Sequence, residues 1–131
     1  MIAVIFEFTP AAGRAPDYMA LAKSLSEDLA RADGFLSIER FQSLTAPDKF
    51  VSLSFWRDEQ AVRAWRNLAG HRAAQAEGRG GIFSGYRLRV AQVVRDYTHE
   101  ARAEAPADSV ALHAHGFGIN RMPGVGTGGG S

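Results

Sequence analysis

His71 is the residue best suited to move protons in the first 97 residues of this sequence, where it is the only histidine. Histidine changes its charge near neutral pH, so His71 could act as a general base, and its imidazole could equally ligate haem iron. The alternative is a surface histidine near a helix end, where its cation interacts favourably with the helix dipole. The sequence leaves these roles open because it does not say which way the imidazole points.

Arginine and tyrosine side chains gather in the last part of the same region. They are Arg79, Tyr86, Arg87, Arg89 and Arg95. A guanidinium can hold an enolate, phenolate or carboxylate through paired hydrogen bonds, so Tyr86 and Arg87 are candidates for stabilising an anion. The alternative is that the arginines form ion pairs with acidic residues of other strands, such as Glu39.

The elements that must position these residues follow from the hydrophobic pattern. An apolar stripe after Pro16 predicts a helix that ends at Asp33-Gly34. Asp58 is a typical N-cap for a second helix, which Gly70 could interrupt before a further turn or two. Strands are expected over residues 2–8, 35–44, 50–56 and 87–97, the last led into by residues 82–86. The order β-α-β-β-α-β predicts an α+β, ferredoxin-like fold, an antiparallel sheet with both helices on one face.

Both faces of the expected sheet carry apolar side chains. The first strand has Ile2 and Phe6 on one face and Ile5 on the other, and the third strand has Leu53 and Phe55 opposite Trp56. Helices on one side would leave the other face bare. We therefore expect a homodimer in which a second copy covers that face, since closed two-fold dimers are the commonest assembly.

Composition narrows the function classes. The chain has 131 residues, 22% of them charged, a net charge of +1 and no cysteine. These values predict no nucleic-acid partner and exclude disulfides and thiolate metal sites. No apolar run approaches the ~18 residues of a membrane-spanning helix, so we expect no membrane partner and a cytoplasmic location. We expect one domain over residues 1–97, followed by a C-terminal extension over 98–131 with a Gly-rich end, either flexible or packed on a partner.

Residues 2 to 97 resemble the antibiotic-biosynthesis-monooxygenase (ABM) group of dimeric α+β barrel proteins. The resemblance is strongest in FVSLSFWRDEQAVRAWRNLAGHRAAQ and continues through GRGGIFSGYRLRVAQVVRDY. It implies that Trp65 lines a pocket between helices and sheet; the alternative is an ordinary core tryptophan. Haem-degrading members place their ligand about one turn after His71, near Gln75, and carry an asparagine on the first strand that is absent here.

The resemblance implies a monooxygenase that acts without a cofactor on a small aromatic or phenolic compound, polyketide-like or quinol-like. In this hypothesis Trp65, Phe55 and Phe83 bind the substrate, His71 is the base, and Tyr86 and Arg87 stabilise the anion. One alternative is a dimer that binds haem or a small hydrophobic ligand without turnover, or that degrades haem. Another alternative is a purely structural dimer whose sheet faces pack closely together and leave no pocket. Fold alone does not choose between them.

Overall fold

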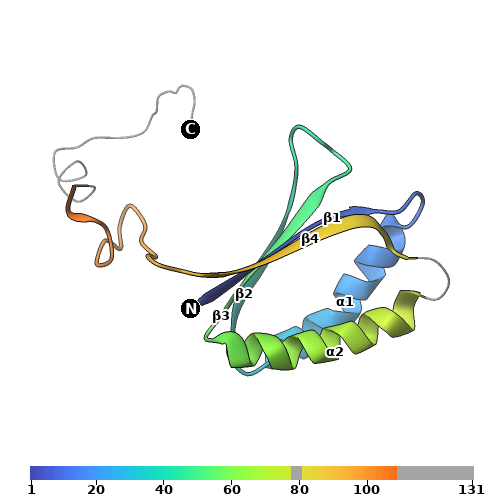
Figure 1. Ribbon diagram of the computed structural model, residues 1–131, viewed down its shortest axis with the longest axis horizontal. Helices are drawn as coiled ribbons and strands as arrows, with labels where there is room; N and C mark the ends of the chain where they lie inside the picture. Colours follow the sequence, from blue (N-terminus) through green and yellow to red (C-terminus); the bar gives the residue numbers. More distant parts are fainter. Residues whose placement is uncertain (78–80, 109–131) are drawn as a thin grey trace. The chain divides into compact units, whose positions relative to one another are not determined.

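The computed structural model describes residues 1–77 and 81–108, with side chains described for residues 1–70 and 81–108. The elements are β1 (Ile2–Pro10), α1 (Ala15–Arg31), β2 (Phe35–Gln42), β3 (Phe50–Trp56), α2 (Glu59–Glu77) and β4 (Phe83–Gln92). The strands form one antiparallel sheet in the order β2-β3-β1-β4. Both helices lie on the same side of this sheet (Figure 1). The ferredoxin-like α+β fold expected from the sequence is therefore confirmed.

The ends of the helices are held by the residues that the sequence indicated. Pro16 lies in the first turn of α1, where its missing N–H is not needed. Gly34 follows that helix with a φ of +83°, in the left-handed region that glycine tolerates best. At the start of α2, Asp58 accepts a hydrogen bond from the backbone N–H of Ala61 at 2.9 Å. This N–H and then the Arg57 guanidinium lower the pKa of Asp58, which acts as the helix N-cap.

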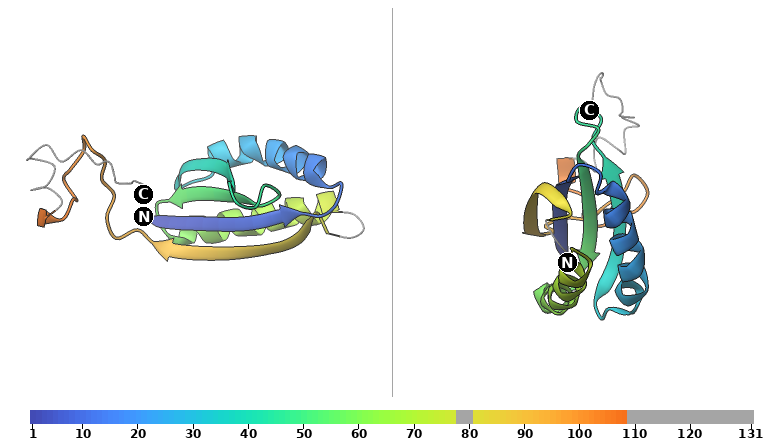
Figure 2. Two further views of the ribbon diagram at one scale, coloured as in Figure 1. Left: turned by 90° about the horizontal axis from the view of Figure 1, so that it is seen from above. Right: turned by 90° about the vertical axis from the view of Figure 1, so that its right-hand side faces the viewer.

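Strand alternation assigns each residue of the sheet to a face. On the helix side, Ile2 and Trp56 pair across β1 and β3 and pack with Leu29, Ala61 and Val62 in the hydrophobic core. The opposite face, which we call the outer face, carries the alternate residues. Its apolar members on the two central strands are Ala3, Ile5, Val51, Leu53 and Phe55. The left view of Figure 2 looks onto this face, with both helices behind it.

Two local expectations were wrong. The second helix does not break at Gly70 but continues to Glu77 as one element. The last strand ends at Gln92 rather than at Tyr97. Beyond it the backbone turns on itself: Thr98 N–H donates to the carbonyl of Ala101, and the Thr98 hydroxyl accepts from two backbone N–H groups. Such turns replace strand pairing as the source of backbone hydrogen bonds.

The chain divides into a compact unit, Met1–Val93, and a second unit that begins at Val94. The composition predicted that the first domain ends at residue 97, four residues after Val93. In the part of the chain that the structure describes, no helix is long and apolar enough to span a membrane. The expected cytoplasmic location stays a prediction, and residues 109–131 of the C-terminal extension lie outside the described residues.

Candidate functional site: a cavity between the helices and the sheet

A cavity of about 420 Å³ lies between the helix side of the sheet and the two helices. All four strands and both helices contribute to its wall, which is mostly aliphatic and aromatic. The aliphatic part includes Val4 from β1, Leu25 from α1, Val62 from α2 and Leu88 from β4. A mostly apolar cavity with a few polar groups is the usual form of a site for a small organic molecule.

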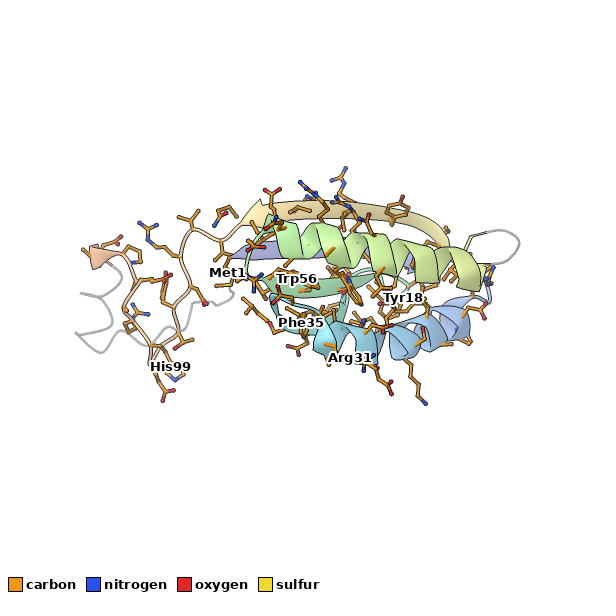
Figure 3. The ribbon with its side chains drawn as sticks, turned by 90° about the horizontal axis from the view of Figure 1, so that it is seen from below. Met1, Tyr18, Arg31, Phe35, Trp56 and His99 are labelled. Atoms are coloured by element: carbon orange, nitrogen blue, oxygen red, sulfur yellow. The ribbon has the colours of Figure 1, made fainter. Side chains whose placement is uncertain are left out.

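Aromatic rings border the cavity at both ends of β1. Near the end of β1, the ring centroids of Tyr18 and Phe83 are 5.9 Å apart, and Phe6 makes an edge contact with Phe83 at 5.3 Å. Near its start, the ring centroids of Trp56 and Trp65 are 5.9 Å apart. Figure 3 labels Trp56 and Tyr18, which lie between α1 and α2 in that view. A planar ligand would therefore meet ring faces or edges at either end.

Serine hydroxyls supply one polar strip of the wall. Ser52 and Ser54 project from β3 toward the helices, beside Phe6 and Val4 of β1. Ser54 is buried and accepts a hydrogen bond from the indole N–H of Trp56 at 2.9 Å. This bond satisfies the donor of a tryptophan that is only 1% exposed and fixes the position of its ring at the cavity wall.

A second polar group, not anticipated from the sequence, joins β2 to α1. Arg40 and Tyr18 both line the cavity, and Arg40 Nε donates a hydrogen bond to the phenol oxygen of Tyr18 at 2.9 Å. Strand alternation in the sequence could have indicated this position. Arg40 lies two residues after Ile38, so both side chains project from the face of β2 that turns toward the helices. Arg66 of α2 also lines the cavity.

Of the six residues that the monooxygenase hypothesis assigned to the site, Trp65, Phe83 and Tyr86 line this cavity. Tyr86 does so from an exposed position at the sheet edge, with 70% of its surface accessible. The ring contacts of Phe83 include Phe6, Phe8 and Tyr18.

The expectation that Phe55 and Arg87 share this space was wrong. Phe55 is paired with Ala3 in the sheet and Arg87 with Glu7, so both project from the outer face. The alternation of side chains along a strand separates them from Ser54, Trp56 and Tyr86, although they are neighbours in sequence.

His71 lies in the second half of α2. It belongs to α2 and directly follows Gly70, which lines the cavity, but its side chain lies outside the described residues. Arg79 also lies outside them. The proposed base therefore stays a prediction.

The expected ion pairs of β4 form with a different partner. Arg89 Nη1 lies 2.6 Å from one carboxylate oxygen of Glu7, and Lys49 Nζ lies 3.1 Å from the other. Lys49, and after it Arg89, holds the pKa of Glu7 below the ordinary glutamate value. Glu39 cannot replace Glu7 because it lies on β2, at the edge of the sheet opposite β4.

The comparison with protein families gives a match over residues 1–77, to the family described as antibiotic biosynthesis monooxygenase. Among characterised proteins, a similar one is the jasmonate monooxygenase ABM of Pyricularia oryzae. It is 47% identical over 93 residues, which cover 71% of this chain and 43% of the relative. The match thus spans less than half the length of that protein.

Two solved structures illustrate the likeness in fold. SnoaB from Streptomyces nogalater, a cofactor-independent oxygenase, has a TM-score of 0.59 and 14% identity, covering 72% of this chain and 94% of its own. A mutant of MhuD with two manganese protoporphyrin IX molecules per active site has a TM-score of 0.59 and 21% identity, covering 75% and 99%. At these identities the likeness concerns the fold alone.

Proposed function

Because this chain belongs to the antibiotic biosynthesis monooxygenase family, we propose that it oxidises a small aromatic or phenolic compound, polyketide-like or quinol-like, inside the cavity and without a cofactor. The observation that carries the proposal is the cavity itself, which is apolar and has aromatic rings at both ends. Its size and lining suit a planar molecule of a few rings. A relative named as a monooxygenase supports the reaction class.

The chemistry needs little from the protein. The substrate loses a proton and becomes an electron-rich carbanion, which reacts with O2 to form a peroxide at that carbon. For an anthrone-type substrate, the methylene carbon becomes a carbonyl: one oxygen atom stays on it, and the other leaves as water with the two methylene hydrogens. The protein then has to bind the substrate, remove a proton and stabilise the anion.

Each task has a candidate group. Trp65 and Phe83 would contact the rings of the substrate, and Tyr86 would donate a hydrogen bond at the exposed rim. His71 would be the base, because it follows a cavity-lining residue in α2. Phe55 and Arg87 take no part in this proposal, because they project from the outer face.

The test is oxygen consumption by the purified 131-residue chain with anthrone and with a quinol as separate substrates. We expect uptake with at least one of them in the absence of any added cofactor, and one labelled oxygen atom in the product under ¹⁸O2. His71→Ala should lower the rate with an anthrone, while Lys23→Ala, an exposed change on α1, should leave it unchanged. No uptake with any substrate, or uptake that requires added haem, would overturn the proposal.

We further propose that the outer face packs against the same face of a second copy. Ile5, Leu53 and Phe55 project from it and are only half-buried within one chain. The Glu7 carboxylate on the same face is already paired with Lys49 and Arg89, so covering it leaves no lone negative charge. Leu53→Arg should convert the expected dimer into a monomer in light scattering, and Met19→Arg, an exposed change on α1, should not. A wild-type monomer at all concentrations would contradict this assembly.

Haem is the alternative ligand. Among the side chains that haem iron takes as ligands, the described residues of the cavity supply tyrosine but no histidine, methionine or cysteine. The Tyr18 oxygen already accepts a bond from Arg40, and Tyr86 is mostly exposed. These residues do not fit haem, so we derive no step through it. A haem titration followed by visible absorbance tests this: a saturable shifted Soret band that His71→Ala abolishes would favour the alternative.

A further inference from the structure

We infer that Arg40 and Tyr18 form a carboxylate-binding site at the opening of the cavity, so that the substrate is an acid with one carboxylate on an apolar body. This inference rests on the proposed function, since it names the class of molecule that the same cavity takes. It starts from the bond between Arg40 Nε and the Tyr18 oxygen at 2.9 Å. That bond joins β2 to α1 across one side of the cavity.

The bond leaves the donors of both residues available to a ligand. Arg40 uses Nε, and neither of its Nη nitrogens has a protein partner among the described residues. The Tyr18 oxygen acts as an acceptor in this bond, so its own hydrogen is free to be donated elsewhere. Two guanidinium N–H groups and one phenol O–H can therefore converge on the same oxyanion.

The charge of Arg40 is also uncompensated. In the described part of the chain, no carboxylate lies within ion-pair distance of it, whereas Arg57, Arg89 and Lys49 each contact an acidic group. Its neighbours in the sheet register are Ser52 on β3 and, on the same face, Ile38, which are both neutral. A cation at the wall of an apolar cavity, with no internal counter-ion, favours an anionic ligand.

Position separates the head of the ligand from its body. Arg40 is exposed and yet lines the cavity, so it lies where the cavity opens to solvent. Toward the start of β1 the wall is mostly apolar, apart from the serine hydroxyls of β3, and it ends at Trp56 and Trp65. A bound molecule would keep its charged end in partial contact with water at Arg40 and extend its apolar body toward the tryptophans.

The geometry favours a carboxylate over a phenol. The parallel Nη donors of a guanidinium match the two oxygens of a carboxylate, and a phenol offers only one oxygen. A carboxylic acid is ionised at neutral pH, whereas an ordinary phenol has a pKa of about 10 and is not. The site therefore discriminates by both charge and shape.

Calorimetric titration of the 131-residue chain with 2-naphthoate and with 2-naphthamide tests the inference, because these two probes differ only in the charged end. We expect the wild type to bind the carboxylate about tenfold more tightly than the amide, a factor suited to a partly solvated charged pair. Arg40→Gln should reduce that ratio to near one, Arg40→Lys should leave an intermediate ratio, and Tyr18→Phe should lower it several-fold.

The matched control is Arg63→Gln, which removes an exposed arginine of α2 outside the cavity wall and should leave the ratio unchanged. Equal binding of both probes by the wild type, no binding of either, or a ratio that falls as much in Arg63→Gln as in Arg40→Gln would overturn the inference. The two proposals can fail independently. Selective binding of the carboxylate without oxygen consumption would overturn the proposed oxygenase function and would still support the carboxylate-binding site.

Discussion

The indole N–H of Trp56 donates a hydrogen bond to the hydroxyl of Ser54 at 2.9 Å, and both side chains are buried at the wall of the cavity. The two residues are separated by one position on β3, so their side chains project from the same face of the sheet. A serine in an apolar strand thus has a structural role: it satisfies the donor of the largest buried side chain.

Replacing Ser54 with alanine should destabilise the protein, because the Trp56 N–H then loses its acceptor in a buried site. We expect a loss of about 1–3 kcal/mol in the free energy of unfolding, measured by urea titration. The free energy of unfolding should fall less for Ser54→Thr, because threonine keeps the hydroxyl that accepts the bond. Ser52→Ala is the control, since it removes a cavity-wall hydroxyl for which the described residues provide no partner. Equal losses for the two alanine variants would contradict the role assigned to this bond.

Gly34 should tolerate alanine poorly for two reasons that a second glycine separates. Its φ is +83°, and an added Cβ would lie 2.6 Å from the Cβ of Ala61. Gly13 has a similar φ of +75° but open space around it. Left-handed strain should therefore lower the free energy of unfolding of Gly13→Ala by only ~1–2 kcal/mol. For Gly34→Ala the free energy of unfolding should fall by about 1–3 kcal/mol more, because the added Cβ overpacks against Ala61. Thermal unfolding of the two variants measures the difference, and similar melting temperatures would argue against the close approach.

Trp65 should govern the binding of aromatic ligands, because its ring borders the cavity and lies beside that of Trp56. We expect Trp65→Ala to weaken the binding of 2-naphthoate by about tenfold, the loss of one aromatic contact with its buried area, and Trp65→Phe to weaken it less. Leu68→Ala, one turn further along α2 and outside the cavity wall, should bind like the wild type. If Leu68→Ala were equally impaired, a general loosening of α2 would explain both variants.

Glu7 should contribute to stability in a pH-dependent manner. Its pKa is lowered in the folded chain by Lys49 and Arg89, so its contribution is complete above the ordinary glutamate pKa of about 4.3 and disappears as the pH falls through the lowered value. The difference in unfolding free energy between the wild type and Glu7→Gln should therefore be constant near neutral pH and narrow below about pH 4. Urea unfolding at several pH values measures it. Glu39→Gln, where the described residues provide no ion pair, should show no such narrowing.

The sequence by itself was enough to predict the fold. Periodic apolar residues in the helices, β-rich runs in the strands, Asp58 as an N-cap and Gly34 after the first helix are local signals, and each is decided by the chain within a few residues. The same signals failed where local evidence is ambiguous: Gly70 lies inside a continuous helix, and the last strand ends at Gln92 although apolar residues follow it.

The composition of the candidate site depended on tertiary structure. Trp65, Phe83 and Tyr86 line the cavity, whereas Phe55 and Arg87 project from the other face because alternate residues of a strand point in opposite directions. The partner of Arg89 was decided by strand order, which brings Glu7 beside it and keeps Glu39 at the far edge. Arg40 and Tyr18 are 22 positions apart in the sequence, and only the packing of α1 over β2 brings the guanidinium to the phenol.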